Sequence, residues 1–560
     1  MTGSSPTDRD LASIQQARQL VEQAAGAAEA LASFSQEQID LILDAMHEAA
    51  RPLAATWARL AVEETGFGNE ADKTLKNRFA TEDLHRYIRP MKTVGVLREE
   101  AGGDLLEIAA PVGVVAAIIP STNPTSTAIY KIFIALKAAN AIVLSPHPRS
   151  RRCIGEVART LADAARRAGA PEGSIGCMSD PALEGTNELM RHPRVGVILA
   201  TGGTGLVRAA YSSGKPAFGV GPGNVPAFVE RSADVPKAAR DIVAGKVFDH
   251  GVLCSSENAV VVDRPVAEEL QREMSAAGAW FLDDGQAAAL ARLAIAPDGS
   301  LNTDIVGKSA AAIASMAGLS PPAGTRCLVA KLTGVGRAHP LSREKLSPIL
   351  AWYAEDGWEA CCERVLEILK YGGMGHTMSI HSKDRGIIMK FALAKPVFRI
   401  VVNTPASVGA VGLTTPLEPS MTLGCGALGG NITSDNIMPR HLINLKRLAF
   451  ETRPFGQAAL APASPAPRRA SAEEIRQKVA QVLQSRQPAP PAPLARAPQP
   501  APVDPPAPRP SGGSAAVAFV SEADVRQAID ERRRILVNRR TIITPSARDL
   551  GQTHRVFQEV

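Results

Sequence analysis

The run Gly113-Val-Val-Ala-Ala-Ile-Ile119 decides the fold class of this chain. An uninterrupted apolar run rich in β-branched residues is typical of a strand that is buried on both faces of a parallel sheet. Residues 126–139, which follow it, have the apolar spacing of an amphipathic helix, and Ala141-Ile-Val-Leu144 has the composition of a second short strand. Together the three segments predict a βαβ unit.

The same alternation continues along the chain. A predicted helix near 152–168, a strand at 195–199 and a helix at 206–213 favour a doubly wound α/β sheet. A second α/β block starts near Val235 and continues to about residue 430, whereas residues 9–95 have helical spacing. Because the 560 residues exceed the roughly 250–300 that one hydrophobic core holds, we expect at least two domains, both of them α/β.

The composition changes toward the C-terminal end. Proline accounts for 11 of the 23 residues from 488 to 510, which is too many for a packed element and predicts an extended linker. Residues 471–486 and 521–536 nevertheless have helical apolar spacing. We therefore expect a disordered C-terminal tail that carries two short amphipathic segments. The apolar stripe of the first segment consists of Ile475, Val479, Val482 and Leu483.

Charge and hydropathy exclude several classes of partner. The formal net charge is +6, but residues 461–560 alone contain 15 Lys and Arg against 9 Asp and Glu, so the body is neutral. A neutral body argues against a nucleic-acid-binding core, whose affinity would rest on neutralising phosphates. The longest apolar run, Ile108–Pro120, is shorter than the roughly 20 residues that cross a bilayer, and the N-terminus lacks the layout of a signal peptide. We expect a cytosolic protein without nucleic-acid or membrane partners.

Seven cysteines are scattered along the chain in neither a disulfide framework nor a paired zinc pattern. We therefore expect reduced thiols and no metal site. Cys254 lies in a glycine-bearing loop between a predicted helix at 238–247 and a predicted strand at 259–262. A thiol in such a loop is a candidate nucleophile, since its thiolate is accessible near neutral pH. An inert buried cysteine remains the alternative on this ground alone.

Further loops that end predicted strands carry small or polar residues. Asn123 in Pro120-Ser-Thr-Asn-Pro124, the loop Ala200-Thr-Gly-Gly-Thr-Gly205, the segment Gly219-Val-Gly-Pro-Gly-Asn224 and Cys254 resemble, in this order, the landmarks of the aldehyde dehydrogenase superfamily. The resemblance covers roughly residues 10–455. Three more motifs resemble its CoA-acylating branch, namely Ser145-Pro-His-Pro148, Gly375-His-Thr377 and Leu423-Gly-Cys-Gly-Ala-Leu-Gly-Gly-Asn431.

That branch includes the aldehyde dehydrogenase half of aldehyde-alcohol dehydrogenases and the propionaldehyde and acetaldehyde dehydrogenases of bacterial microcompartments. The resemblance implies that a short aldehyde, NAD+ and CoA are converted to acyl-CoA and NADH through a thioester on Cys254. It also implies that the Asn123 amide and the Cys254 backbone N–H bind the oxyanion. His376 and Glu257 are second-rank catalytic candidates, because a lone histidine or a strand glutamate is as easily structural.

The resemblance also implies a dinucleotide site. The small residues of the 202–205 loop would let backbone N–H groups and the next helix N-terminus approach phosphates. Glu344 resembles the glutamate that binds the nicotinamide ribose. Ser145 replaces the usual ribose-binding lysine, so this position does not decide between NAD and NADP. The implied cofactor residues are Thr122, Ser145, His147, Pro148, Thr201, Gly202, Gly203, Thr204, Gly219, Val220, Gly221, Glu344 and Leu346.

Gly219 stands where the hydrolytic aldehyde dehydrogenases carry the glutamate that activates water. Without that base the thioester should survive until the thiol of CoA attacks it, and a thiol of pKa about 8.5 needs less activation than water. The sequence thus favours acyl transfer. Two alternatives remain, a hydrolytic aldehyde dehydrogenase and a catalytically idle scaffold that binds a shell.

The resemblance assigns roles to the predicted parts. Residues 1–235 would hold the N-terminal helices and the NAD-binding domain, with an oligomerisation hairpin near 95–112. Residues 236–430 would form the catalytic domain, and residues 431–456 would return to the cofactor domain with a strand that builds the homo-oligomer. The remaining 457–560 resemble encapsulation-type tails that dock enzymes onto microcompartment shell proteins, and Thr541–Leu550 resembles segments of other microcompartment-associated proteins. We expect a location inside such a compartment.

Overall fold

The computed structural model describes residues 8–455, 477, 519–531, 533–538 and 541–559. By its contacts the chain divides into two compact units, residues 1–459 and 460–560. Among the described residues, every helix falls short of the combined length and apolar character that a membrane-spanning helix needs.

The N-terminal part of the first unit is helical, as the sequence predicted. The first helix packs directly against the strands of the sheet described next, whereas the other four form an outer layer on helices that cover this sheet. Four of the N-terminal helices bury an apolar face, whereas α4 (Glu70–Arg78) buries Lys73, Lys76 and Asn77. The second helix begins at a capping box in which Ser35 and Gln38 satisfy each other's backbone N–H groups. The helices are α1 (Arg9–Leu31), α2 (Gln36–Ala50), α3 (Ala54–Thr65), α4 (Glu70–Arg78) and α5 (Leu84–Ile88).

A five-stranded parallel sheet forms the centre of this half, in the order β5-β4-β3-β6-β7. All residues of the central β3 are buried, which confirms the prediction from its apolar run. Because the chain leaves β3 toward β4 and later returns to β6 on its other side, a crevice opens at the carboxyl ends of β3 and β6. The elements are β3 (Val114–Ile119), α6 (Pro124–Lys137), β4 (Ala141–Pro146), α7 (Arg151–Arg167), β5 (Ile175–Cys177), α8 (Leu183–Arg191), β6 (Val195–Thr201), α9 (Thr204–Tyr211) and β7 (Ala217–Val220).

The second α/β block contains a seven-stranded parallel sheet in the order β10-β11-β12-β9-β8-β13-β14, with apolar clusters on both faces. Its first strand, β8, lies ahead of the boundary expected at residue 235. The strands are β8 (Val225–Val229), β9 (Glu257–Asp263), β10 (Ala279–Phe281), β11 (Cys327–Lys331), β12 (Ile349–Glu355), β13 (Gly375–His381) and β14 (Val397–Val402). The helices are α10 (Val235–Val247), α11 (Ala267–Ala276), α12 (Asp284–Ala294), α13 (Ala310–Met316), α14 (Gly357–Lys370), α15 (Arg385–Ala394) and α16 (Ala406–Ala410).

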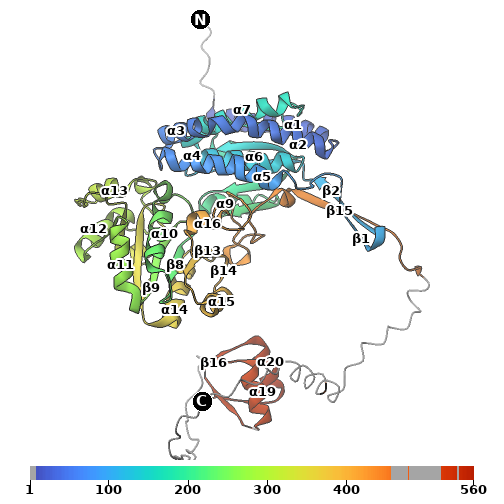
Figure 1. Ribbon diagram of the computed structural model, residues 1–560. Coiled ribbons are helices and arrows are strands. Elements are labelled where there is room, and N and C mark those ends of the chain that lie inside the picture. The colour runs from blue at the N-terminus through green and yellow to red at the C-terminus, as the bar shows by residue number, and fades with distance from the viewer. Residues whose placement is uncertain (1–7, 456–476, 478–518, 532, 539–540, 560) are drawn as a thin grey trace, which may run out of the picture. The chain divides into compact units, whose positions relative to one another are not determined.

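A three-stranded antiparallel sheet projects from the body (Figure 1). It consists of the hairpin β1 (Val96–Glu100) and β2 (Leu105–Pro111), which the late strand β15 (Ile443–Ala449) joins. In the register, Ile443 pairs with Pro111 and Ala449 pairs with Leu105. The hairpin and the returning strand therefore lie side by side, although they are far apart in the sequence.

The second unit is folded in its described part. The elements are β16 (Phe519–Val520), α19 (Glu522–Asp530), β17 (Ile535–Val537), β18 (Ile542–Ile543), α20 (Pro545–Thr553) and β19 (Phe557–Glu559). The expectation of a disordered tail therefore does not extend to residues 519–559. The physical reason is that the apolar stripe of α19 packs within its own segment, in a cluster of Val520, Val525, Ala528, Ile535, Val537, Ala547 and Val556. The amphipathic segment 471–486, apart from Gln477, and the proline-rich stretch lie outside the described residues.

Candidate active site

A cavity of about 630 Å³ lies where the carboxyl ends of β3, β4, β6 and β7 face the loop 252–255 that precedes β9. The five-stranded sheet contributes strand ends to its walls, and the seven-stranded sheet contributes loops that precede its strands. Of the predicted residues, those that line it are Thr122, Asn123, Ser145, His147, Pro148, Thr201, Gly202, Gly203, Val220, Gly221, Cys254, Glu344 and Leu346. Gly219, Glu257 and His376 are outside this lining.

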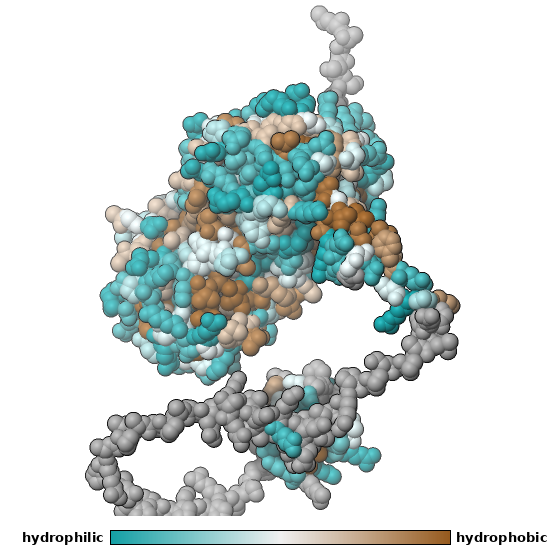
Figure 2. Space-filling model, turned by 45° about the vertical axis from the view of Figure 1, so that its right-hand side comes forward, coloured by the Kyte–Doolittle hydropathy of each residue, from teal (hydrophilic) through white to brown (hydrophobic). Residues whose placement is uncertain are grey.

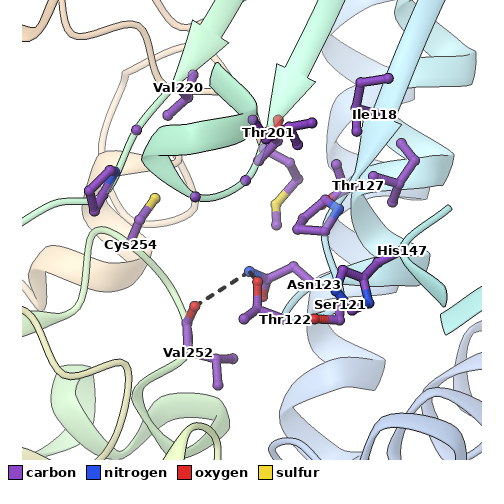
Figure 3. A pocket seen from close by; sticks show the side chains of 18 of the residues that line it. Ile118, Ser121, Thr122, Asn123, Thr127, His147, Thr201, Val220, Val252 and Cys254 are labelled. Carbon is purple, nitrogen blue, oxygen red and sulfur yellow. Dashed lines mark hydrogen bonds between the residues drawn. The ribbon is translucent and has the colours of Figure 1, made fainter. Parts of the chain in front are cut away.

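Cys254 is half-buried, between a short 3₁₀ turn at Phe248–Gly251 and strand β9. Figure 3 shows its sulfur and the amide of Asn123 reaching into the same cavity from opposite walls. Burial raises the pKa of the Cys254 thiol to about 12, with a further contribution from the nearby Glu344, while Arg399 acts in the opposite direction. The resting thiol is therefore protonated at neutral pH.

Asn123 occupies the N-cap position of α6, and its side chain makes no capping bond. Instead its Oδ1 accepts from Lys76 Nζ at 2.5 Å. Its Nδ2 donates to Thr122 Oγ1 at 3.2 Å and, more weakly, to the carbonyl oxygen of Val252 at 3.5 Å. The amide thus spans the gap between the loop after β3 and the loop that carries Cys254.

The residues at the ends of β4 and β6 fit a dinucleotide. Thr201 Oγ1 is buried and has no hydrogen-bond partner among the described residues. Gly203 is the N-cap of α9 and leaves the first N–H groups of that helix without a side-chain cap, which suits a phosphate.

His147 Nδ1 accepts from Arg149 N at 3.1 Å, so the ring proton lies on Nε2, and burial lowers the pKa of this histidine. Ser145 Oγ is already bonded to the hydroxyl of Thr186 at 2.8 Å. Thr204, which follows Gly203, is the first residue of α9.

Gly219 leaves no room for a side chain. A Cβ at this position would lie 2.7 Å from Val207 Cγ1 and 2.9 Å from Tyr211 Cε2. Among the described residues of the lining, Glu344 is the single carboxylate. Its Oε1 accepts from Gly223 N at 2.9 Å, and burial raises its pKa to about 7. No second carboxylate of the described lining is thus placed to activate water.

His376 and Glu257 are fully buried at the beginnings of β13 and β9. Burial lowers the pKa of His376 to about 3, and its Nδ1 lies 3.0 Å from Thr377 Oγ1. Burial raises the pKa of Glu257 to about 8, and its Oε1 accepts from Ala406 N at 2.5 Å. Both side chains are therefore neutral at pH 7, and the structure does not bring them to the cavity surface.

Three charged residues next to the site, Lys73, Lys76 and Asp249, were not among the predicted site residues. Two lysines three residues apart on a polar helix are typical of a solvated face. Their burial is visible only once the helix is placed against the loops after β3 and α10.

Comparison with known sequences agrees with this geometry. The family model described as "Aldehyde dehydrogenase family" matches residues 2–282. The chain is 42% identical over 435 residues to the bifunctional aldehyde-alcohol dehydrogenase of Escherichia coli, a match that covers 77% of this chain and 49% of that protein. The chain thus spans about half the length of the aldehyde-alcohol dehydrogenases it matches. It is 36% identical to the succinate-semialdehyde dehydrogenase (acetylating) of Clostridium kluyveri, over 77% of this chain and 95% of that protein.

Solved structures agree as well. An acetylating aldehyde dehydrogenase from Geobacillus thermoglucosidasius is 50% identical, with a TM-score of 0.79 over 80% of this chain and 99% of that one. Two propionaldehyde dehydrogenases superpose with a TM-score of 0.70 over 78% of this chain and 97% of theirs. One, 30% identical, is from the fucose utilisation microcompartment of Clostridium phytofermentans, and the other, 29% identical, is from Rhodopseudomonas palustris with bound CoA and an acylated cysteine. The chain belongs to the aldehyde dehydrogenase family and, within it, to the acylating group.

Proposed function

We propose that this protein is a CoA-acylating aldehyde dehydrogenase, which converts a short aldehyde, NAD+ and CoA into acyl-CoA, NADH and a proton. The observation that carries the proposal is that Cys254 and Asn123 line one cavity, while Gly219, directly before the lining residue Val220, has no room for a side chain. A cysteine nucleophile and an oxyanion donor are present, and the base that would hydrolyse the thioester is not found in the described lining. The acylating relatives support the same reading.

Cys254 and Asn123 have separate roles in the proposed reaction. Cys254 loses its proton and its sulfur bonds to the aldehyde carbon, while the Asn123 amide and the Cys254 backbone N–H bind the oxygen that becomes negative. A bound nicotinamide supplies the hydride acceptor. Loss of the hydride leaves a thioester on Cys254. The thiol of CoA loses its proton and its sulfur bonds to the thioester carbon, while the bond from that carbon to the Cys254 sulfur breaks. This forms acyl-CoA, and Cys254 takes up one proton and returns to its resting thiol.

The direct test is product analysis. The enzyme is incubated with propionaldehyde or acetaldehyde and NAD+, with and without CoA, and the products are separated by mass spectrometry. Acyl-CoA that forms only when CoA is present supports the proposal. Free acid formed steadily without CoA would indicate a hydrolytic enzyme, and no NADH under either condition would indicate an idle scaffold.

The walls of the cavity favour a short apolar substrate. Ile118, Leu253, Val411 and Met421 contribute apolar surface, and acidic side chains other than Glu344 are absent from the described lining. Propionaldehyde and acetaldehyde are therefore the first substrates to test.

We propose NAD as the oxidant. The Nε2–H of His147 and the carboxyl of Glu344 would bind its riboses. Its phosphates would lie in the loop formed by Thr201, Gly202, Gly203 and Thr204.

We further propose that the three-stranded sheet joins copies of this chain into a homo-oligomer. Strand β15 is exposed over most of its length and presents Leu445 and Leu448, each more than 40% exposed. Figure 2 shows apolar surface gathered where this sheet meets the body. Exposed apolar surface on a strand that others can extend favours association. Sedimentation of a Leu445→Lys/Leu448→Lys variant, compared with the unaltered protein, tests the proposal.

Segment 471–486 is proposed to dock the enzyme onto microcompartment shell proteins, which would place it inside such a compartment. The sequence predicts an amphipathic helix here, and a helix beside a proline-rich linker would have no apolar surface of its own on which to bury the stripe, whereas docking into a groove of a partner would bury it. The propionaldehyde dehydrogenase from a microcompartment supports this setting by its similarity to the catalytic unit.

A further inference from the structure

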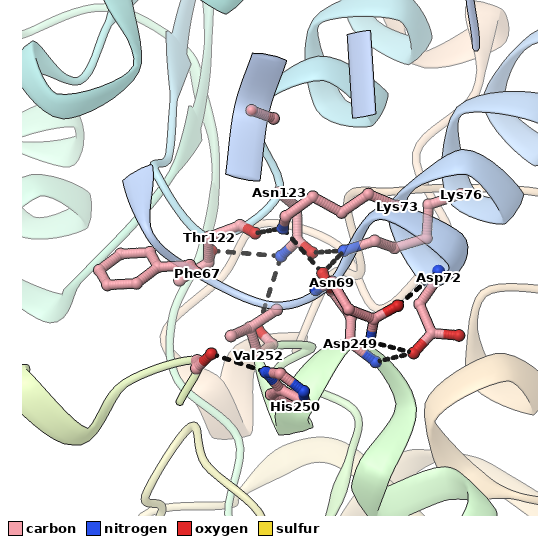
Figure 4. A network of polar contacts seen from close by, with 12 residues as sticks. Phe67, Asn69, Asp72, Lys73, Lys76, Thr122, Asn123, Asp249, His250 and Val252 are labelled. Atoms are coloured by element: carbon pink, nitrogen blue, oxygen red, sulfur yellow. Dashed lines mark hydrogen bonds and ion pairs between the residues drawn. The ribbon is translucent and has the colours of Figure 1, made fainter. Parts of the chain in front are cut away.

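Two lysines, one turn apart on α4, reach from the helical layer to the loop after β3 (Figure 4). Both side chains are at least 95% buried. Lys73 Nζ donates to the backbone oxygen of Thr122 at 3.0 Å, and Lys76 Nζ donates to Oδ1 of Asn123 at 2.5 Å. The pair thus holds adjacent residues of the same loop, one by its backbone and one by its side chain.

Asp249 keeps both ammonium groups in place. Its Oδ2 pairs with Lys73 Nζ at 2.9 Å and with Lys76 Nζ. Burial alone would raise the pKa of Asp249, but the two lysines outweigh it and lower the pKa. Its Oδ1 accepts from Asn69 N at 2.9 Å, and its own N–H donates to Asp72 Oδ2 at 2.7 Å. The carboxylate and the backbone N–H of Asp249 therefore all bond to residues of α4 or its N-cap. Lys73, Lys76 and Asp249 together form one charged cluster.

The backbone at Asp249 is fixed as closely as its side chain. Asp249 has a φ of 47°, in the left-handed region that non-glycine residues rarely adopt. Gly68 lies against its carboxylate, because a Cβ there would be 1.8 Å from Asp249 Oδ1. Since Asp249 precedes Cys254 by five residues, the cluster ties α4, the loop of Asn123 and the start of the nucleophile loop to one another.

The cluster also decides which way the Asn123 amide faces. An ammonium group has only donors, so the amide atom that meets Lys76 must be the oxygen. The carbonyl of Val252 only accepts, so the atom that faces it must be the nitrogen. The N–H groups of Asn123 consequently point toward the loop of Cys254, and their bond to Val252, at 3.5 Å, is long enough to be exchanged at little cost.

We propose that Lys76 is a positioning residue of the reaction, which holds Oδ1 of Asn123 so that Nδ2 meets the oxyanion formed on the Cys254 adduct. The inference rests on the proposed function. Lys76 is outside the described lining of the cavity, so its proposed effect on the reaction runs through Asn123. Lys73 contributes the same charge to the same carboxylate but holds only the backbone of Thr122, which makes it a matched control.

The test is a double-mutant cycle on the full chain. Asn123→Ala should lower kcat for CoA-dependent NADH formation by about 100- to 1,000-fold, because the oxyanion donor is lost. Lys76→Met leaves the donor in place but no longer held, so it should lower kcat by about 10- to 100-fold. Lys73→Met, which removes the same charge, should lower kcat by a clearly smaller factor. In the Asn123→Ala background, Lys76→Met should have no further effect on kcat, because its only route of action is gone. Lys76→Gln, which can still donate to Oδ1, should recover most of the rate and serves as the folding-safe variant.

Two results would overturn the inference while leaving the proposed function intact. One is an equal loss from Lys76→Met with and without Asn123, and the other is a loss from Lys73→Met as large as that from Lys76→Met. If Lys76→Met does not fold, the Lys76→Gln variant decides instead. A kcat of Lys76→Gln as low as that of Asn123→Ala would overturn the inference. An unaltered enzyme without CoA-dependent NADH formation would instead refute the proposed function itself.

Discussion

The amide nitrogen of Asn123 lies 3.5 Å from the carbonyl oxygen of Val252, two residues before Cys254. Asn123 follows β3 of the five-stranded sheet, and Val252 precedes β9 of the seven-stranded sheet. The proposed oxyanion donor and the nucleophile thus come from opposite halves of the catalytic unit. Their relative placement depends on how the two sheets are joined, and the buried Lys76–Asp249 pair lies at that junction.

Gly219 should be intolerant of any side chain. Gly219→Ala places a Cβ 2.7 Å from Val207 Cγ1, and overpacking of this kind costs about 1–3 kcal/mol. Gly221→Ala is the control for stability, because its Cβ would meet nothing within 4 Å. Thermal unfolding should therefore show a lowered Tm for the first variant only. Gly219→Glu should form no free acid without CoA, and steady hydrolysis by that variant would contradict this account of the position.

Alkylation of Cys254 in the free enzyme should accelerate with pH. Because burial raises the pKa of this thiol to about 12, the thiolate fraction grows about tenfold per pH unit between pH 7 and 10. The measurement is the rate of labelling by iodoacetamide, followed by mass spectrometry of the peptide that contains Cys254. A plateau reached near pH 8 would show that the resting thiol is already activated.

Glu257 should make stability depend on pH. Its folded-state pKa of about 8 lies above the ordinary value of about 4.3, so the folded protein binds the proton more tightly. Its stabilising contribution is therefore fully present below the ordinary pKa and is lost as the pH rises toward 8. Glu257→Gln, which cannot ionise, should gain in Tm relative to the unaltered protein as the pH is raised from 5 to 8. A Tm difference that stays constant over this range would contradict the assignment of a buried, protonated carboxyl.

Removal of residues 461–560 should leave kcat and KM nearly unchanged, because all proposed catalytic and cofactor residues lie in the first unit. The same truncation should abolish co-purification with microcompartment shells. Val479→Glu together with Leu483→Glu should reproduce that loss in the full-length chain, since burying charge in a groove is costly. Equal entry of the truncated enzyme into shells would refute the targeting role, and lost activity would show that the boundary is misplaced.

The parts of the fold that could be predicted are those encoded in local pattern. Val114–Ile119 could be identified as a buried strand because every residue in it is apolar, and Cys254 and Asn123 could be proposed because their motifs follow in a known order. The cluster around Asp249 could not be predicted, since Lys76 is 173 residues away in sequence and a lysine on a polar helix gives no signal of burial.

The fold of residues 519–559 escaped prediction for a related reason. Its strands are two or three residues long, too short for alternation to show, and its core combines single residues from several segments. Val525 and Ala528 carry a helical pattern, but only the three-dimensional structure shows that Ile535, Val537 and Ala547 cover it.

We infer that Cys254 carries a thioester that CoA, and not water, removes. In the decisive experiment, the enzyme is mixed with aldehyde and NAD+ in the absence of CoA, and NADH and the intact protein mass are followed together. We expect a burst of one NADH per active site, an acyl adduct on Cys254, and discharge of the adduct when CoA is added, with neither burst nor adduct in Cys254→Ala. Continuous NADH formation without CoA, or an adduct that persists in Cys254→Ala, would contradict it.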